Sequence, residues 1–366
     1  ATGFGGWIAT LPPAAPVRAP PPVPAAEAAA MRDALRPPKR ARPLVAIVAI
    51  NDGTEVTDYL MPYGILRRAD VADVVALATR DGPVDLYPAL RVRAEATLAE
   101  FDARHPDGAD YVVVPAMRRD DDPTVLAWLK AQAAGGAIIV AVCAGAKVVA
   151  AAGLLDGRRA TTHWWYVDPL RREDPSIRYV PDRRMVVERG VATTTGISAS
   201  MPMALTLVEA IAGRDRASAV ARDLGIVEWD ARHDSSAFRL TRPFALTALA
   251  NTLAFWRHEE LALPIAPGVD EVSLALVADA WSRTYRSEVL TFAVDAGPIE
   301  SRNGLAILPD RVAERRPDQL LLSPVAGHSP AEALDQALRA IALRHGPATR
   351  DLVAMQLELT EQPSAP

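Results

Sequence analysis

The stretch Ala137-Ile-Ile-Val-Ala-Val-Cys143-Ala-Gly-Ala-Lys-Val-Val-Ala-Ala-Ala-Gly153 contains the strongest fold signal in the chain. It predicts a buried apolar strand, a tight Cys-Ala-Gly turn and a helix. A sharp turn of this kind is typical of a nucleophile elbow, which presents one side chain at the end of a sheet and leaves backbone N–H groups free. Those amides and the helix dipole favour a thiolate and a developing oxyanion. The alternative is that Cys143 is a buried structural cysteine, since free cysteines are commonly core residues.

Short apolar runs rich in β-branched residues alternate with alanine-rich helical segments around this turn. The predicted strands are 44–50, 74–79, 111–115 and 137–142, and the predicted helices are 57–69, 97–101, 123–134 and 147–152. This alternation predicts an α/β fold with a parallel sheet covered on both faces. A hairpin near 188–190 and a helix over 200–212 follow. Because ligands bind at the carboxyl ends of strands in such sheets, the position of Cys143 favours a functional site.

Composition excludes several classes of function. The chain has 366 residues, of which 50% are hydrophobic, and this size predicts two domains. A net charge of −5 argues against nucleic acid as the main partner, because phosphate binding depends on clustered Lys and Arg. Cys143 is the only cysteine, so an intrachain disulfide and an all-cysteine zinc site are excluded. The sequence has no nucleotide-binding glycine motif, no metal-binding histidine spacing and no apolar run of about 18 residues, so we expect no cofactor, no metal and no membrane span.

The N-terminal 1–42 segment is rich in proline and alanine and is interpreted as a leader or linker, with a short helix over 25–35. The chain begins with Ala1, and an alanine- and proline-rich tether often follows a removed signal peptide or anchor. A cytoplasmic protein with a loose N-terminus is the alternative, so both cytoplasmic and extracytoplasmic locations stay open. The predicted units after the linker are an α/β domain over 43–217, a helical connector over 218–260 and a third unit over 261–366.

The third unit is interpreted as a shortened second copy of the first α/β part. The run that begins Gly53-Thr-Glu-Val-Thr aligns with Gly268-Val-Asp-Glu-Val, and Arg80-Asp-Gly-Pro-Val aligns with Asp295-Ala-Gly-Pro-Ile at the same offset. After a small deletion, 110–115 aligns with 318–323. The second copy contains no cysteine, so any chemistry of Cys143 occurs once per chain. Chance similarity between helical sequences is the alternative.

The elbow and the following Ala151-Ala-Gly-Leu-Leu-Asp-Gly-Arg-Arg-Ala-Thr-Thr-His163-Trp resemble the DJ-1/PfpI superfamily, which has the class I glutamine amidotransferase-like fold. The nearest likeness is to the branch that contains isocyanide hydratases and the sensor domains of AraC-type regulators. The resemblance extends over about 43–224 and includes the run from Gly53 to Asp58, the 112–115 strand end and the 190–205 run. It implies a flavodoxin-like sandwich with a small-molecule site at Cys143.

The resemblance also implies roles for individual side chains. Cys143 matches the elbow nucleophile, and Asp58 matches the acid that meets the cysteine from the first helix. There Asp58 would hydrogen-bond the sulfur in its protonated form or act as a general acid/base; a plain first-turn carboxylate is the alternative. Glu55 lies on the same helix face and is the competing acid. His163 matches a histidine near the cysteine and would be a base or proton shuttle, or else a packed histidine held by the backbone.

Two backbone amides would hold an oxyanion, those of Ala144 and Ala116. The sequence departs from the family at both places, because many members carry paired glycines at the second position and isocyanide hydratases tend to have threonine after the nucleophile. Alanine resists backbone geometries that glycine allows, so the second donor is in question. Trp164 would line the pocket or fill the core. Because members frequently dimerise, the chain is expected to form a homodimer or an in-chain pseudo-dimer.

Two functions from different classes remain open. The first is a cysteine-dependent hydrolase, amidase or hydratase that acts on a small carbon–nitrogen or carbonyl compound through a thioester- or thioimidate-like intermediate. The second is a non-catalytic sensor or binding protein in which the same pocket recognises a small molecule, or in which Cys143 is reversibly oxidised. A DNA-binding regulator is disfavoured, because the region after Gly213 shows no basic helix-turn-helix.

Overall fold

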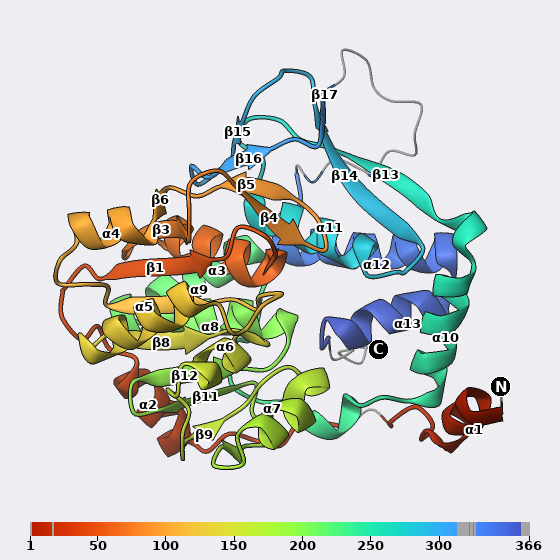
Figure 1. The fold of residues 1–366 in the computed structure, drawn as a ribbon, viewed down its shortest axis with the longest axis horizontal. Helices are drawn as coiled ribbons and strands as arrows, with labels where there is room; N and C mark the ends of the chain where they lie inside the picture. The colour runs from red at the N-terminus through yellow and green to blue at the C-terminus, as the bar shows by residue number, and fades with distance from the viewer. Residues whose placement is uncertain (1, 17, 313–321, 323–324, 326, 360–366) are drawn as a thin grey trace.

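A seven-stranded sheet forms the centre of the first half of the chain, in the order β11-β12-β8-β7-β1-β3-β6. The computed structural model describes residues 2–16, 18–312, 322, 325 and 327–359 (Figure 1). The strands are β1 (Leu44–Ala49), β3 (Asp73–Ala78), β6 (Ala96–Thr97), β7 (Tyr111–Val114), β8 (Ile138–Ala141), β11 (Met185–Glu188) and β12 (Val191–Thr194). All neighbours are parallel except β11 and β12, which form the expected hairpin. The α/β fold class is confirmed.

Helices cover both faces of this sheet. One face packs against α2 (Ala25–Ala34), α3 (Val56–Ala69), α8 (Ser200–Ala212) and α9 (Arg214–Leu224), and the other against α4 (Leu98–Arg104), α5 (Pro123–Ala134), α6 (Gly145–Ala151) and α7 (Val167–Glu173). Successive residues of β1 enter opposite cores: Val45 and Ile47 belong to the first, Ala46 and Val48 to the second. Burial on both faces explains why the predicted strands are continuous apolar runs.

The segment before β1 is attached to the sheet. Leu35 is fully buried, and its carbonyl accepts a 2.6 Å hydrogen bond from the Tyr111 hydroxyl. The buried Asp110 carboxylate accepts hydrogen bonds from the backbone N–H groups of Arg40 and Leu44. The short helix expected over 25–35 is present as α2, and an additional helix, α1 (Thr2–Thr10), precedes it. The part of the predicted linker next to β1 is therefore packed structure.

The region around the predicted connector is largely helical. It contains η3 (Ser235–Ala237), α10 (Arg242–Leu253) and η4 (Phe255–Arg257), while α9 spans the expected boundary at residue 217. Before it, β9 (Arg159–Ala160) pairs in parallel with β10 (Arg178–Tyr179), and the short helices η1 (Trp164–Tyr166) and η2 (Ile197–Ala199) flank the sheet. In the described part of the chain, no helix is long and apolar enough to cross a membrane.

The second half repeats the order of a strand, a helix and a parallel strand. It consists of β13 (Glu259–Pro264), α11 (Glu271–Ser282), β14 (Ser287–Ala293), β15 (Ile299–Glu300), β16 (Ala306–Leu308), β17 (Arg311–Val312), α12 (Pro330–His345) and α13 (Pro347–Gln356). Strands β13, β14 and β17 form a three-stranded parallel sheet, as expected for a shortened α/β copy. Of the third aligned run, 318–323, all residues except Leu322 lie outside the described residues.

A five-stranded sheet joins the two halves, in the order β15-β16-β5-β4-β2. Its first-half strands are β2 (Thr54–Glu55), β4 (Pro83–Tyr87) and β5 (Arg91–Arg93), and β5 pairs with β16 across the boundary. Figure 1 shows the second half, in cyan to blue, beside the first, with β5 next to β16. Helices α3 and α11 also pack against each other. These contacts bring second-half residues to the end of the main sheet where Cys143 lies.

Candidate active site

Cys143 occupies a strained turn between β8 and α6. Its φ is +56°, in the left-handed region that costs a side chain other than glycine roughly 1–2 kcal/mol. Two threonines hold its backbone: its N–H donates to Thr194 Oγ1 and its carbonyl accepts from Thr162 Oγ1, both at 3.0 Å. A Cβ at Gly145 would lie 2.0 Å from the Val114 carbonyl oxygen, so only glycine fits. The surroundings thus impose a conformation that Cys143 would not adopt by itself.

Cys143 lies on the wall of a cavity of about 200 Å³ and is only 4% exposed. Glu55 and Arg283 lie on the same wall. Aromatic rings form much of the rest, from Tyr87, Trp164, Trp165, Tyr166, Phe244 and Tyr285. Pockets for drug-sized ligands span roughly 300–1,000 Å³, so this one suits a small molecule with little charge.

Asp58, the first predicted acid, is fully buried behind the cavity wall. Its carboxyl accepts a 3.1 Å hydrogen bond from the Ala116 N–H and a 3.4 Å one from the Ser200 hydroxyl. Burial raises the pKa of Asp58 well above its usual value, and the charge of Glu55 raises it further. Asp58 is therefore a neutral acid near pH 7.

Glu55, the competing acid, is the carboxyl that reaches the cavity. Its Oε1 accepts a 2.8 Å hydrogen bond from Arg283, and its Oε2 accepts bonds of 2.7 Å from the Thr57 hydroxyl and the Asp58 N–H. Burial, followed by the charge of Asp279, raises the pKa of Glu55 to about 7, against the opposing effect of Arg283. The two predicted acids lie together, and Glu55 is the one that titrates near neutral pH beside Cys143.

The Cys143 thiol is protonated at rest. Burial raises its pKa well above the usual value, and the neighbouring carboxyls of Asp58, Glu55 and Glu358 raise it further wherever they are ionised, whereas the Ala144 N–H favours the thiolate. Of the two predicted oxyanion donors, the Ala116 N–H already donates to Asp58. Of the two predicted donors, the Ala144 N–H is therefore the one at the turn that can bind an oxyanion. The Cys143 thiol needs a base to remove its proton before it can react as a nucleophile.

His163 holds a loop and has no free ring nitrogen. The Trp165 N–H donates to Nδ1 at 3.1 Å, which leaves Nε2 to donate to the Gln356 carbonyl at 3.0 Å. Burial lowers the pKa of His163, so the ring is neutral. The structure thus places His163 at the cavity wall in the arrangement of the packed alternative.

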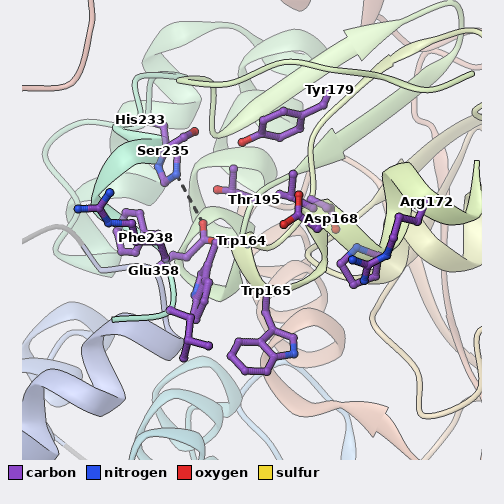
Figure 2. A pocket seen from close by; sticks show the side chains of 15 residues that line it. Trp164, Trp165, Asp168, Arg172, Tyr179, Thr195, His233, Ser235, Phe238 and Glu358 are labelled. Carbon is purple, nitrogen blue, oxygen red and sulfur yellow. Dashed lines mark hydrogen bonds and ion pairs between the residues drawn. The ribbon is translucent and has the colours of Figure 1, made fainter. Parts of the chain in front are cut away.

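Trp164 separates the Cys143 cavity from a larger one of about 510 Å³, and it lines both. Its indole N–H donates to the Met355 carbonyl at 3.0 Å. Figure 2 shows the residues that line the larger cavity, with Trp164 and Trp165 close to each other and with Phe238 on the side of Trp164. No sequence motif indicated this second cavity, because its residues come from separate segments of the chain.

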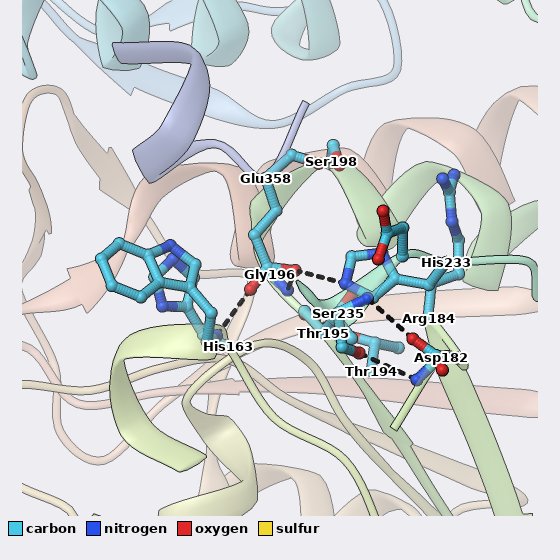
Figure 3. Close-up of polar contacts among 12 residues, drawn as sticks. His163, Asp182, Arg184, Thr194, Thr195, Gly196, Ser198, His233, Ser235 and Glu358 are labelled. Atoms are coloured by element: carbon cyan, nitrogen blue, oxygen red, sulfur yellow. Dashed lines mark hydrogen bonds and ion pairs between the residues drawn. The ribbon is translucent and has the colours of Figure 1, made fainter. Parts of the chain in front are cut away.

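Glu358 connects the C-terminal segment to the loops that carry His163 and Gly196 (Figure 3), and it lines the larger cavity. Its carboxylate accepts hydrogen bonds from the Trp164 N–H at 2.6 Å and the Gly196 N–H at 2.8 Å, and it lies 3.7 Å from His233 Nε2. A Cβ at Gly196 would approach the Glu358 side chain to 2.8 Å, so the fit requires glycine. The second half of the chain therefore fixes the loop that carries His163.

The sequence did not single out the polar residues Arg283 and Gln356 of the cavity wall, Glu358 beside it, or the lining residues Tyr87, Tyr166, Ile197, Phe244 and Tyr285. The three polar residues are the ones that act on the predicted site. All three come from the second half, and none belongs to a recognisable motif. The signal that was available is the internal alignment, which places Arg283 opposite Arg68 at the end of the first helix. Within the described residues, no group of three or more His, Cys, Asp and Glu side chains is placed to hold a metal ion.

Comparison with known proteins agrees with the fold of the first half. The sequence profile of the DJ-1/PfpI family matches residues 45–210. Isonitrile hydratase from Pseudomonas putida is 36% identical over 170 residues, which cover 44% of this chain and 70% of that protein. The chain therefore belongs to the DJ-1/PfpI family.

Solved structures of DJ-1 proteins are also similar to part of this chain. A mutant of a DJ-1 superfamily protein from Salmonella typhimurium is 27% identical, with a TM-score of 0.45 over 51% of this chain and 100% of that one. DJ-1beta from Drosophila melanogaster is 23% identical, with a TM-score of 0.46 over the same shares.

Proposed function

We propose that this protein is a cysteine-dependent hydratase or hydrolase of a small, uncharged carbon–nitrogen or carbonyl compound. The observation that carries the proposal is the presence of Cys143 and Glu55 on one cavity wall, with the thiol at a strained turn and the pKa of Glu55 at about 7. A group with a pKa near the working pH can both take and return a proton. The relative named isonitrile hydratase supports a carbon–nitrogen substrate.

An isonitrile illustrates the chemistry. Glu55 takes the proton of the Cys143 thiol, directly or through a water molecule, and the sulfur attacks the terminal carbon of the isonitrile. That carbon accepts a proton, which gives a thioimidate bound to the enzyme. Water then adds to the same carbon, the carbon–sulfur bond breaks, and the sulfur regains a proton as an N-substituted formamide leaves. One isonitrile and one water are consumed for each formamide.

The surrounding groups have matching roles in this proposal. The Ala144 N–H stabilises negative charge that develops next to Cys143. A neutral Asp58 keeps a second carboxylate charge away from the sulfur, because two like charges in a buried site repel each other. The aromatic rings exclude water from the bound substrate.

A non-catalytic binding or sensor function is the second candidate, and one observation favours it. The Ala116 N–H donates to Asp58, so a single amide near the sulfur is available for an oxyanion. In that case the cavity recognises a small molecule without turning it over.

The test is formamide production from a small alkyl isonitrile, followed by assays on small amides and aldehydes. We expect Cys143→Ala to be inactive and Glu55→Gln to lose about 100-fold or more in kcat, as expected for a lost general acid/base. Asp58→Asn is the matched control and should lose far less, because an amide replaces an already neutral acid. Binding without turnover of any of these compounds would establish the second candidate instead, and equal losses in the two acid variants would exclude the role given to Glu55.

A further inference from the structure

The pairing between the two halves follows a single offset in residue number. Gly268 follows Gly53 by 215 residues, and Gly297 follows Gly82 by the same 215. Strands β5 and β16 are antiparallel neighbours, and Val92 lies opposite Ile307, its own counterpart at that offset. Each strand therefore pairs with its equivalent, as two copies do on either side of a two-fold axis.

The rest of the five-stranded sheet obeys the same relation. Thr54 of β2 pairs in parallel with Leu86 of β4, and Val269 forms a parallel bridge with Ser301 in the second half. Val269 and Ser301 are the counterparts of Thr54 and Leu86 at the 215-residue offset. The antiparallel pairs β4-β5 and β15-β16 flank the central contact in equivalent register. The two halves thus form this sheet symmetrically.

The ion pairs that cross between α3 and α11 are reciprocal. Arg283 donates to Glu55 at 2.8 Å, and Arg68 pairs with Asp270. Arg283 is the counterpart of Arg68, and Asp270 is the counterpart of Glu55, at the same 215-residue offset. A self-complementary interface between two identical subunits produces two equivalent ion pairs of this kind, one on each side of the two-fold axis.

We propose that residues 259–312 take, within one chain, the place of the second subunit of a two-fold dimer, and that this built-in partner completes the Cys143 cavity by supplying Arg283. Arg283 is a positioning residue that acts through Glu55. Of the two reciprocal pairs, Glu55 with Arg283 lines that cavity and Asp270 with Arg68 does not. The second half contains no cysteine for an equivalent site. The same contact would orient Glu55 whether the protein is an enzyme or a binding protein. The reactivity of the Cys143 thiol and the pairing of the two halves therefore test this proposal separately from turnover.

The charges explain what Arg283 does for Glu55. Its guanidinium contacts two buried carboxyls, since its Nε lies 2.7 Å from Asp279 while its Nη2 reaches Glu55. A cation in direct contact lowers the pKa of a carboxyl by about 1–3 units. Burial and the charge of Asp279 act in the opposite direction. Without Arg283, Glu55 would stay protonated throughout the neutral range.

The first experiment measures the rate of Cys143 alkylation by iodoacetamide as a function of pH. Ionised Glu55 repels the thiolate, so the wild-type profile should change slope near the pKa of Glu55, about 7. Arg283→Gln should move this inflection upward by about one to three pH units. Arg68→Gln is the matched control, since it breaks the reciprocal pair away from the cavity and should leave the inflection in place. An unchanged profile in Arg283→Gln, or equal changes in both variants, overturns the role of Arg283.

A conservative variant covers the case in which Arg283→Gln does not fold. Arg283→Lys keeps the positive charge, so the inflection should stay within about one pH unit of the wild-type position. A profile for Arg283→Lys that has lost its inflection, in a protein that still folds, would contradict positioning of Glu55 by charge.

The second experiment tests the built-in partner by disulfide formation in the Cys143→Ala background. In this chain Val92 faces Ile307, so Val92→Cys alone should stay monomeric under oxidation. Val92→Cys combined with Ile307→Cys should form a disulfide within one chain, because directly opposed antiparallel residues lie within reach of that bond. In a dimer of two chains joined through β5, each Val92 would face the Val92 of the other chain. A disulfide-linked dimer of the single variant would therefore overturn the proposal.

Discussion

The two halves of this chain share one interface and differ in what they place beside it. In the first half, Glu55 at the interface lines the cavity of Cys143. In the second half, the equivalent Asp270 pairs with Arg68, with no cysteine in that copy. Helix α11 is nevertheless almost entirely buried, as α3 is, because the two pack against each other and each packs against a further helix, α12 for α11 and α8 for α3. The packing of α3 against α11 therefore constrains residues in both halves, whereas the cysteine site is present in the first half alone.

The largest expected effect is at the turn that only the first half contains. Gly145→Ala would force a Cβ to within 2.0 Å of the Val114 carbonyl oxygen, a backbone atom that cannot rotate away. We expect a loss of about 3 kcal/mol in the free energy of unfolding, at the upper end for overpacking, measured by chemical denaturation. Gly135→Ala is the control, since its φ of −75° and its nearest contact of 3.4 Å are ordinary, and it should change stability little. Equal stability of the two variants would contradict this account of the turn.

The next effect tests the contact that the two halves share. A Cβ at Gly64 of α3 would lie 2.4 Å from Glu271 Oε1 and 2.6 Å from Val272 Cγ2 of α11. Gly64→Ala should therefore destabilise the protein by about 1–2 kcal/mol, although alanine is normally the better helix former by about 1 kcal/mol. Gly6→Ala in α1, where nothing lies within 4 Å of the new Cβ, should cause no loss. A stabilised Gly64→Ala variant would mean that α3 and α11 pack less closely than described.

A smaller effect isolates the backbone strain at Cys143. Because φ is +56° there, Cys143→Gly should be more stable than Cys143→Ala by about 1 kcal/mol. At most positions the order is the reverse, since glycine loses more conformational freedom on folding. Thermal denaturation of the two variants side by side measures the difference. If the alanine variant is the more stable, the turn is not strained in solution.

The smallest expected effect is a change in the pH dependence of stability. The pKa of Glu55 is raised from 4.5 to about 7, so between these values the folded protein binds more protons than the unfolded chain. Its contribution to stability is therefore present below about pH 4.5 and is lost as the pH rises through about 7. Glu55→Gln removes this titration, so the melting temperature of wild type relative to the variant should fall between pH 5 and 8. A constant difference across that range would contradict the raised pKa.

Most of the first half could be predicted from local sequence. The runs that form β1, β7 and β8 are apolar on both faces, and the turn at Cys143 is marked by small residues that only a sharp strand-to-helix connection requires. The hairpins β4-β5 and β15-β16 were not predicted, because β5, β15 and β16 have only two or three residues each and β5 pairs with β16 of the other half. The division of roles between Glu55 and Asp58 was left open, because a three-residue spacing predicts both on one helix face. That prediction is wrong: Glu55 ends β2 and is the N-cap of α3, so it reaches the cavity, whereas Asp58 lies inside the first turn, and both are buried.

Local sequence was enough to predict the α/β class and the position of Cys143 after a central strand, and it suggested a second, cysteine-free copy. These features depend on hydrophobic periodicity and motif spacing, which can be recognised from residues that are close together in the sequence. Only the tertiary structure decided that Glu55 faces the cavity, that His163 has both ring nitrogens occupied, and that Arg283 and Glu358 reach the site from the second half. Those contacts join residues up to 228 positions apart, and a pKa or a hydrogen bond depends on which groups meet in space rather than on which are adjacent in the chain.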